Sequence, residues 1–437
     1  MNTSATTSPA PAAAASGSKS AASRALIIGV AGIVVGLFGL FHAFTTHDSR
    51  PVFGWLIGWA FWFSMFTGVL YLVIFTYLFD TGWAVVIRRQ LEHALGAFPM
   101  LLVGFVPLLL MALGVFGAEN QGLLWKWLDP SQTIPGAEHV IGKDPLFVHK
   151  AAWLSLPFFC ARLAIYTLVF GAFARGFRKN SFALDRDPNP VYFLRCRKLA
   201  AGGIYAVSLA ATFAAFDLFM SLSYQWYSTI YGVWFFSTSV CSGLAATIVI
   251  CFLLSQREGQ PLYGLYNRAH HYTLGCMLLA FVTFWAFVSF CQYLLVYMSD
   301  MPEETWWYNL RELNANWAQS SWWWVSLGLI FGYFFLPFFA LLPYQSKVCR
   351  GRLLGIAIWV LVFQLLDLYF NILPGKLPDA NNVLGYKVVE FIPSIWDLAT
   401  LIGVGGLCAW AYFRSQAQQE IIPIHDPRIE ESLKYHE

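Results

Sequence analysis

The chain has 437 residues, of which 58% are hydrophobic and only 12% are charged, with a net charge of +3. A soluble globular chain carries roughly 25% charged residues, so the composition excludes a soluble protein and predicts that lipid covers much of the surface. The small net charge gives no argument for a nucleic-acid partner.

Residues 1–24 are rich in Ala, Ser, Thr and Pro and lack the apolar core of a signal peptide, which predicts a disordered cytoplasmic tail. Ten apolar runs follow, each long enough to cross a hydrocarbon core of ~30 Å at 1.5 Å per residue. We therefore predict an all-α integral membrane protein with about ten transmembrane helices in residues 25–413 and a cytoplasmic C-terminal tail in residues 414–437. The predicted spans are residues 25–44, 53–79, 94–117, 151–174, 199–222, 231–255, 272–298, 321–343, 352–373 and 392–413.

The positive charges predict how these helices are oriented. With the N-terminus in the cytoplasm, 19 of the 27 Lys and Arg residues fall in inner segments, 7 fall in outer loops and Arg162 lies within a span. This almost threefold bias agrees with the positive-inside rule. Both termini are therefore expected on the cytoplasmic side of a bacterial inner membrane.

The eight cysteines are scattered through apolar runs and form no C-x-x-C pair or haem-attachment motif. Clusters of iron and sulfur, and structural zinc, need grouped thiolates. We therefore interpret the cysteines as packing residues and expect no covalently bound cofactor.

Ionisable residues inside a bilayer are costly and usually have a reason to be there. Arg162, Asp217 and Asp367 lie within spans, and the predicted orientation places all three in the outer half of the membrane. Either they serve a site that faces outward, such as one for a quinol head group, or they form structural ion pairs. A deep arginine needs a partner, and Asp217 is the candidate for Arg162. His42, His149 and Asp397 lie near outer helix ends, where capping is the more ordinary explanation.

The outer loop after the seventh span contains Met301-Pro-Glu-Glu-Thr-Trp-Trp307. A proline followed by Glu303 and Glu304 is typical of a helix start, because acidic side chains favour a helix N-terminus. We predict a short interfacial helix here, and the neighbouring tryptophans are expected to anchor it at the membrane surface.

Three segments resemble one known family. They are Asp217–Gly232, the run Phe284–Leu295 followed by Met301–Glu304, and the tail Pro423–Leu433. They are similar to the second quinone-binding-type membrane subunit of bacterial quinol:cytochrome c oxidoreductase, alternative complex III, within the polysulfide-reductase-like (NrfD-like) membrane family. The similarity extends over nearly everything after the start of the first helix.

The resemblance implies two four-helix bundles flanked by one helix at each end. It also implies a complex with multihaem and monohaem cytochrome c subunits, an iron–sulfur subunit and a sister NrfD-like membrane subunit. Haem and iron–sulfur clusters would belong to those partners only, and menaquinone or ubiquinone would be the ligand in the membrane. The roles left to this chain are support, a second quinone pocket or a proton path. The candidates for quinone binding or a proton path are Arg162, Asp217, His149, Asp367, Asp397, His42 and Gln292, and Glu303 and Glu304 are candidates for partner contact.

The chain departs from the family pattern at three places. Ser223, Tyr224 and Gln225 stand where the family usually has an acid, a proline and a histidine. Cys276 replaces a lysine in the seventh span, and Gln364 replaces a histidine three residues before Asp367. Each change removes a protonatable group, which weakens the proton-path hypothesis and favours a scaffold role.

Two other classes of function stay open. Ten helices with intramembrane charges also fit a secondary transporter, although no pair of Gly- or Pro-broken spans occupies corresponding positions. A purely structural membrane anchor would need no quinone contact.

Overall fold

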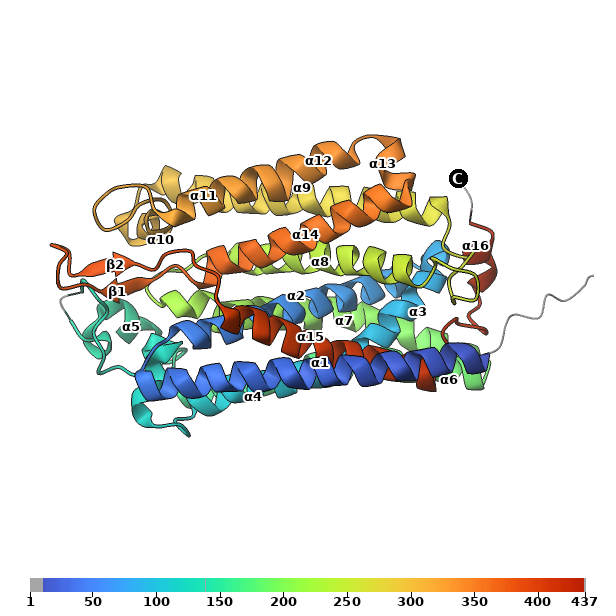
Figure 1. The fold of residues 1–437 in the computed structure, drawn as a ribbon, viewed down its shortest axis with the longest axis horizontal. Helices are drawn as coiled ribbons and strands as arrows, with labels where there is room; N and C mark the ends of the chain where they lie inside the picture. The colour runs from blue at the N-terminus through green and yellow to red at the C-terminus, as the bar shows by residue number, and fades with distance from the viewer. Residues whose placement is uncertain (1–10, 138, 436–437) are drawn as a thin grey trace, which may run out of the picture.

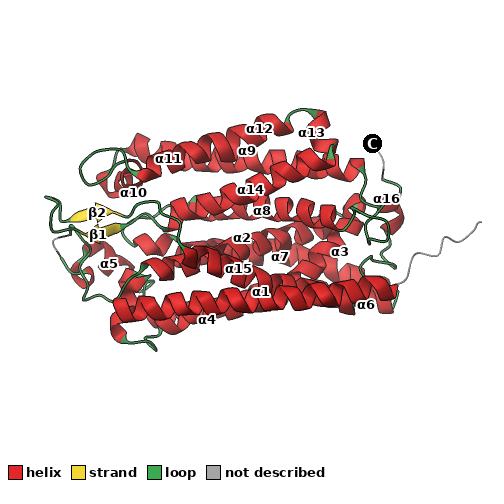
Figure 2. Ribbon diagram, in the orientation of Figure 1, coloured by secondary structure: helices red, strands yellow, loops and turns green. Residues whose placement is uncertain are grey.

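The computed structural model describes residues 11–137 and 139–435. Within them, ten helices are long and apolar enough to cross a membrane, which confirms the predicted all-α membrane fold. They lie roughly parallel to the long axis of the molecule (Figures 1 and 2). The only named strands among the described residues are β1 (Lys376–Pro378) and β2 (Tyr386–Val388), an antiparallel pair with Lys376 opposite Val388.

The first half of the chain supplies one bundle and most of the second half supplies the other, whereas α15, from the second half, packs on α1 and α2. The first half contains α1 (Pro11–Thr46), α2 (Arg50–Leu78), η1 (Gly82–Ala84), α3 (Val85–Ala94), η2 (Leu95–Ala97), α4 (Phe98–Ala112), η3 (Ala118–Leu123), η4 (Lys126–Leu128), η5 (Ile141–Lys143), α5 (Pro145–Lys150), α6 (Leu156–Arg186), α7 (Pro190–Leu218) and η6 (Met220–Ser223). The second half contains α8 (Tyr231–Leu253), α9 (Arg268–Ser299), α10 (Pro302–Glu312), α11 (Ser321–Gly328), the π-helix η7 (Leu329–Phe335), α12 (Leu336–Leu341), α13 (Tyr344–Val348), α14 (Arg350–Ile372), α15 (Ile395–Gln418) and α16 (Ile429–Leu433).

Helices α2, α4, α6 and α7 pack around one another, and α8, α9, α14 and the α11–η7–α12 span form the second bundle. Helices α2 and α8 join the two bundles, and α1 and α15 pack together along the flank of α2 (Figure 1). Helix α2 is the central element, because 94% of its most apolar window is buried. We call the end that carries α5, α10 and the β1–β2 pair the hairpin end, and the end that carries α3, α13 and α16 the tail end.

Three indoles fix α2 against its neighbours. The Nε1–H groups of Trp55 and Trp59 donate to the backbone carbonyls of Gly104 and Leu101 in α4, each at 2.8 Å. Trp62 donates to the carbonyl of Leu401 in α15 at 2.7 Å. Because lipid offers no partner for an indole N–H, these bonds specify which helices pack on which face of α2.

Small residues let α1 approach α15 closely. A Cβ placed on Gly32 would lie 2.6 Å from the backbone nitrogen of Gly403, and one on Gly403 would lie 2.7 Å from the nitrogen of Ile33. Such contact between helix backbones is typical of small-residue interfaces in membranes. The opposite face of α1 exposes large apolar side chains, including Phe38 and Phe41.

Two sequence predictions of element boundaries were wrong. Residues 11–24 are helical and form the beginning of α1, rather than part of a disordered tail, because this alanine-rich stretch continues the helix that follows. Residues 1–10 lie outside the described part of the chain. The fourth span begins at Leu156 and continues to Arg186, because an α-helix needs no apolar side chains once it leaves the bilayer.

Candidate functional site

A largely apolar cavity of about 560 Å³ lies in the second bundle, towards the hairpin end. Helices α9, α10, α11, η7 and α14 form its walls, and Trp234 of α8 reaches it as well. Among its lining residues, Phe290, Ile330 and Phe335 are also exposed on the outer surface of the protein. The cavity, which we call the aromatic cavity, therefore lies next to the region where lipid would stand.

Asp367 is the buried acid of this cavity. Its Oδ2 accepts hydrogen bonds from the indoles of Trp234 and Trp285, both at 3.1 Å, and its Oδ1 accepts one from the Asn371 amide at 3.1 Å. The hydroxyl of Thr238 lies 3.4 Å from Oδ2. Asp367 forms no ion pair with any described residue, so neutral donors alone hold its carboxyl group.

Arg311 of α10 is the buried base of the same cavity. Its guanidinium donates to the backbone carbonyls of Trp307 at 2.6 Å and Phe370 at 2.8 Å, and it lies 3.1 Å from the centre of the Trp307 ring. No carboxylate among the described residues pairs with it. Burial lowers the pKa of Arg311 to about 9, so the group stays positively charged at neutral pH.

A single residue connects the acid to the base. Asn371 donates from its side-chain amide to Asp367, and its backbone carbonyl accepts a hydrogen bond from Arg311 at 3.3 Å. Gln292 adds a further polar group to the wall and donates to the hydroxyl of Tyr308 at 3.1 Å. The cavity therefore combines aromatic walls with the carboxyl groups of Asp367 and Glu312, the guanidinium of Arg311 and the amides of Gln292 and Asn371.

The π-helix η7 forms one wall of this cavity. Its wider turn places Tyr333 fully inside the protein, where the ring centre lies 4.2 Å from that of Trp285 and the hydroxyl lies 3.5 Å from Thr238. Leu329, Ile330, Phe334 and Phe335 line the cavity from the same segment. Single π-helical turns within α-helices often occur at functional sites.

Arg162 and Asp217 form the ion pair that their depth predicted. Two guanidinium nitrogens of Arg162 donate to the two carboxylate oxygens at 2.7 and 2.9 Å, and Asp217 also accepts from Tyr166 at 2.6 Å and Trp153 at 3.0 Å. Asp217 is only 1% exposed. Each charge thus has its partner and each carboxylate oxygen accepts two hydrogen bonds, as in a structural pair, and the pair lies in the first bundle whereas Asp367 lies in the second.

Asp397 is likewise neutralised. Its carboxylate accepts hydrogen bonds from Arg50 at 2.6 and 2.7 Å, from Tyr369 at 2.6 Å and from the backbone N–H of Ser394 at 2.8 Å. The last bond belongs to a capping box that begins α15. His42 and His149 are exposed, on α1 and α5, and line neither the aromatic cavity nor the hollow described next.

A larger and more polar hollow of about 1000 Å³ opens at the hairpin end between the two bundles. Lys126 and Lys376 lie on its wall, and burial together with the charge of Lys376 lowers the pKa of Lys126. The departures Tyr224 and Gln225 line it too and donate to Asp144 at 2.8 and 2.9 Å. Tyr224 and Gln225, which stand where the resembled sequence pattern has a proline and a histidine, thus hold the loop before α5.

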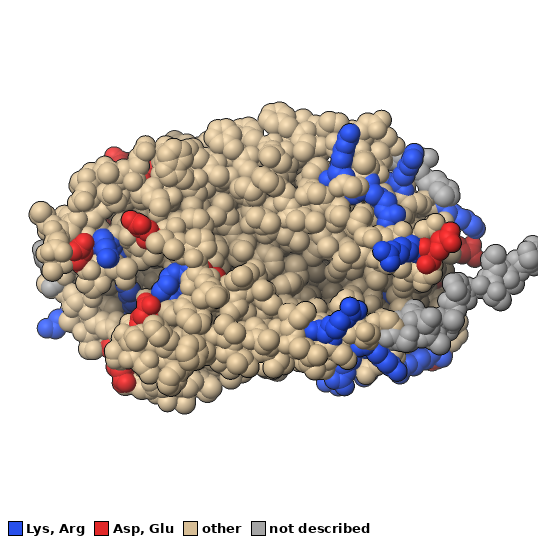
Figure 3. Space-filling model, viewed as in Figure 1, with Lys and Arg blue, Asp and Glu red and all other residues tan. Residues whose placement is uncertain are grey.

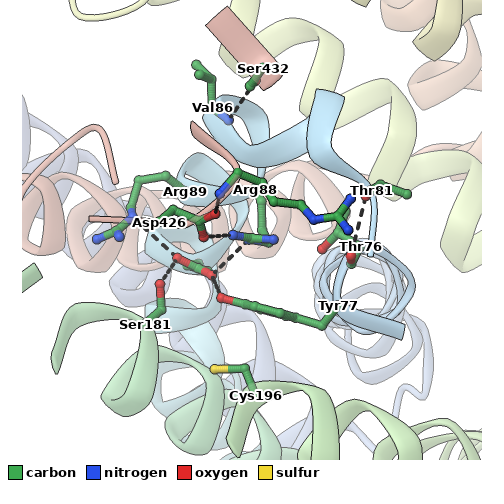
Figure 4. Close-up of polar contacts among 12 residues, drawn as sticks. Thr76, Tyr77, Thr81, Val86, Arg88, Arg89, Ser181, Cys196, Asp426 and Ser432 are labelled. Carbon is green, nitrogen blue, oxygen red and sulfur yellow. Dashed lines mark hydrogen bonds and ion pairs between the residues drawn. The ribbon is translucent and has the colours of Figure 1, made fainter. Parts of the chain in front are cut away.

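The tail end contains a buried network of charges, which Figure 4 shows in close-up. Arg88 of α3 contacts Asp426 of the C-terminal tail and lies 3.6 Å from Glu92. Arg89 pairs with Asp185 of α6 at 2.5 Å, and Tyr77 donates to Glu92 at 2.6 Å. Farther along the tail, Ser432 donates to the carbonyl of Trp83 at 2.8 Å. The network therefore fastens the C-terminal tail to the ends of the helices.

The structure gathers only two of the seven predicted quinone or proton-path residues, Asp367 and Gln292, at one cavity. The predicted short helix at Pro302 is confirmed as α10, with Glu303 and Glu304 in its first turn. The sequence prediction missed Arg311, because it was counted as an outer-loop charge. The sequence feature that could have identified Arg311 is its position four residues after Trp307. This spacing puts both residues on the same face of the predicted interfacial helix.

No group of three or more His, Cys, Asp or Glu side chains is placed to hold a metal ion within residues 11–137 and 139–435. Comparison with models of known protein families finds no match to this chain, and no curated protein sequence matches it. The geometry of the aromatic cavity and the resemblance of the three sequence segments are therefore the basis for assigning a function.

Proposed function

We propose that this chain is a membrane subunit of a quinol-oxidising electron-transfer complex and that the aromatic cavity binds a quinone ring. The observation that supports this most is that Asp367 and Arg311 line one largely apolar, aromatic cavity and form no ion pair with each other. An apolar ring with an oxygen at each end needs such a site, with flat walls, an acceptor and a donor. The resemblance to the alternative complex III subunit points to the same class of ligand.

In this proposal the Asp367 carboxyl group accepts a hydrogen bond from one quinol hydroxyl. Arg311 donates to the opposite oxygen, while Trp285 and Trp307 bound the ring. The apolar tail leaves between Phe290 and Phe335 towards lipid. Oxidation of a quinol to a quinone releases two electrons and two protons. The resemblance assigns the electrons to haem and iron–sulfur centres of partner subunits, and in this proposal Asp367 takes up one proton while the other passes to water at the hairpin end.

The proposed orientation puts the hairpin end outside and both termini in the cytoplasm of a bacterial inner membrane. On the face in Figure 3, Lys and Arg gather at the tail end and the middle belt carries almost no charge. The positive-inside rule then favours the tail end as cytoplasmic. The cytochrome c and iron–sulfur partners would dock at the hairpin end, where Glu303 is exposed.

Complex membership is tested by mild-detergent purification of the tagged chain, followed by a reduced-minus-oxidised visible spectrum of the eluate. Strong c-type haem bands are expected. They would have to come from partner subunits, because this sequence has no haem-attachment motif. A colourless, single-subunit eluate would contradict the proposal and make substrate transport the next function to assay.

Quinone binding is tested separately with a fluorescent quinol analogue on the purified assembly. We expect Asp367→Asn and Trp285→Phe each to weaken binding by about tenfold, because each alters a buried hydrogen bond worth ~1–3 kcal/mol. Trp324→Phe is the matched control, since Trp324 is 68% exposed and does not line the cavity. Haem bands together with unchanged binding in all three variants would indicate a purely structural anchor.

A further inference from the structure

A second membrane-facing hollow lies in the first bundle and has a different chemistry from the aromatic cavity. It is a groove of about 630 Å³ between α4 and α6, with α2 and α7 behind it. Most of its wall is apolar, and Leu102 and Leu168 on its rim are 41% and 69% exposed. The groove is therefore open on the side where lipid would stand.

Two arginines mark the end of this groove nearest the tail end. Arg175 and Arg178 of α6 both line it, and their spacing of three residues puts them on one helix face. Neither forms an ion pair with a described residue. Arg178 donates to the Ser415 hydroxyl at 2.9 Å, but its Nε is buried and has no hydrogen-bond partner among the described residues.

Glu92 acts on Arg178 through its charge, but it forms no ion pair with Arg178 or Arg175. Glu92 already accepts hydrogen bonds from Tyr77 and Ser181 and lies 3.4 Å from Arg89. An anion beside Arg175 and Arg178 must therefore come from outside this part of the chain. Because the rest of the groove is apolar, that anion should belong to a molecule with a long apolar body.

We infer that this groove binds an anionic phospholipid of the leaflet at the tail end, with its phosphate beside Arg175 and Arg178 and an acyl chain along α6. The groove follows α6 from Arg178 back to Leu163, a distance of about 22 Å at 1.5 Å per residue. That is enough to hold an acyl chain across one leaflet, half of a hydrocarbon core ~30 Å thick. Basic pockets between membrane helices recognise lipid head groups in this way.

The test uses the full chain, purified in mild detergent, stripped of lipid and titrated with phosphatidylglycerol. Bound lipid is counted by native mass spectrometry, and the thermal midpoint is followed in parallel. We expect retention of phosphatidylglycerol by the wild type and binding weaker by about tenfold or more in the double variant Arg175→Gln/Arg178→Gln, since two cationic contacts are lost. Lys179→Gln, one residue beyond the groove, is the matched charge control and should bind normally.

A second variant keeps the inference testable if the double variant does not fold. Gly171 lines the groove and a Cβ there meets nothing within 4 Å, so Gly171→Leu should fill the acyl path and weaken binding without altering charge. Gly202→Leu on α7 is its control, because that position is equally open and lies outside the groove. Equal stabilisation by phosphatidylcholine or by inorganic phosphate, or normal binding in Gly171→Leu, would overturn the inference.

Discussion

At the scale of single residues, the two deep aspartates differ in how their charge is balanced. Asp217 receives two hydrogen bonds from Arg162, whereas Asp367 receives hydrogen bonds from neutral groups only. A buried ion pair is costly to break, because the remaining charge is left without a partner. The Asp217 carboxylate is thus part of a buried ion pair in the first bundle, whereas the Asp367 carboxyl group faces a cavity in the second.

Removing one member of the Arg162–Asp217 pair should destabilise the protein by about 3–5 kcal/mol. We expect Arg162→Ala and Asp217→Asn to lower the thermal midpoint in detergent and to reduce assembly. The double variant Arg162→Met/Asp217→Leu should recover much of the loss, since neither charge is then stranded. Slower quinol oxidation with unchanged stability would instead show that this pair lines a pocket.

The loop before α5 should lose stability at acidic pH. Burial raises the pKa of Asp144, but hydrogen bonds from Gln225, Tyr224 and the backbone of Leu146 outweigh it, so the folded-state pKa is lower than usual. The stabilisation is therefore fully present above the ordinary pKa, ~3.9, and is lost as pH falls through the lower folded-state value. Hydrogen exchange of the α5 amides, measured relative to the intrinsic exchange rate at the same pH, should accelerate below about pH 4. The variant Tyr224→Phe/Gln225→Ala should exchange faster at pH 6 and show a smaller acceleration on acidification.

At the scale of elements, hydropathy predicted the ten spans because lipid demands an apolar surface from every crossing helix. It missed the extension of α6 beyond residue 174 and the π-helix at Leu329–Phe335, since neither has a hydropathy signal. Depth alone identified Asp367 and the Arg162–Asp217 pair. It could not identify Arg311, because α10 packs against the end of α14 and buries a charge that the sequence places in a loop.

Larger side chains at the glycines between α1 and α15 should destabilise the protein. Gly32→Leu is expected to destabilise the protein by about 1–3 kcal/mol, because the added atoms meet the α15 backbone. Thermal midpoints in detergent would measure this effect. Gly202→Leu is the matched control, since an added Cβ there meets nothing within 4 Å, and an equal loss in both variants would contradict the explanation.

At the scale of the whole molecule, the C-terminal tail connects elements from both halves of the chain. Asp426 contacts Arg88, Arg428 donates to Asp80 at 2.7 Å, and the backbone carbonyl of Tyr435 accepts from Asn267 at 2.7 Å. The sequence predicted only the location of this tail. Its role in holding the two bundles together depends on partners more than a hundred residues away.

Asp426→Asn should therefore lower the thermal midpoint of the full chain, because Arg88 is only 3% exposed and loses a charged partner. Glu430→Gln is the control from the same tail. Its ion pair with Lys434 lies on the surface, with 79% of the Glu430 side chain exposed, and should contribute no measurable stability. Equal midpoints for wild type and Asp426→Asn would show that the tail rests on the surface without holding it.

The three indole bonds of α2 also bear on how the protein is made. Helix α2 is synthesised second, yet the carbonyl that accepts the Trp62 N–H belongs to Leu401, 339 residues later. Until α15 has been synthesised, the indole N–H of Trp62 therefore lacks this acceptor, and lipid offers no replacement for it. The bundle is completed only when the last spanning helix has been inserted, so a nascent chain interrupted before α15 keeps an incomplete surface that quality-control factors could recognise.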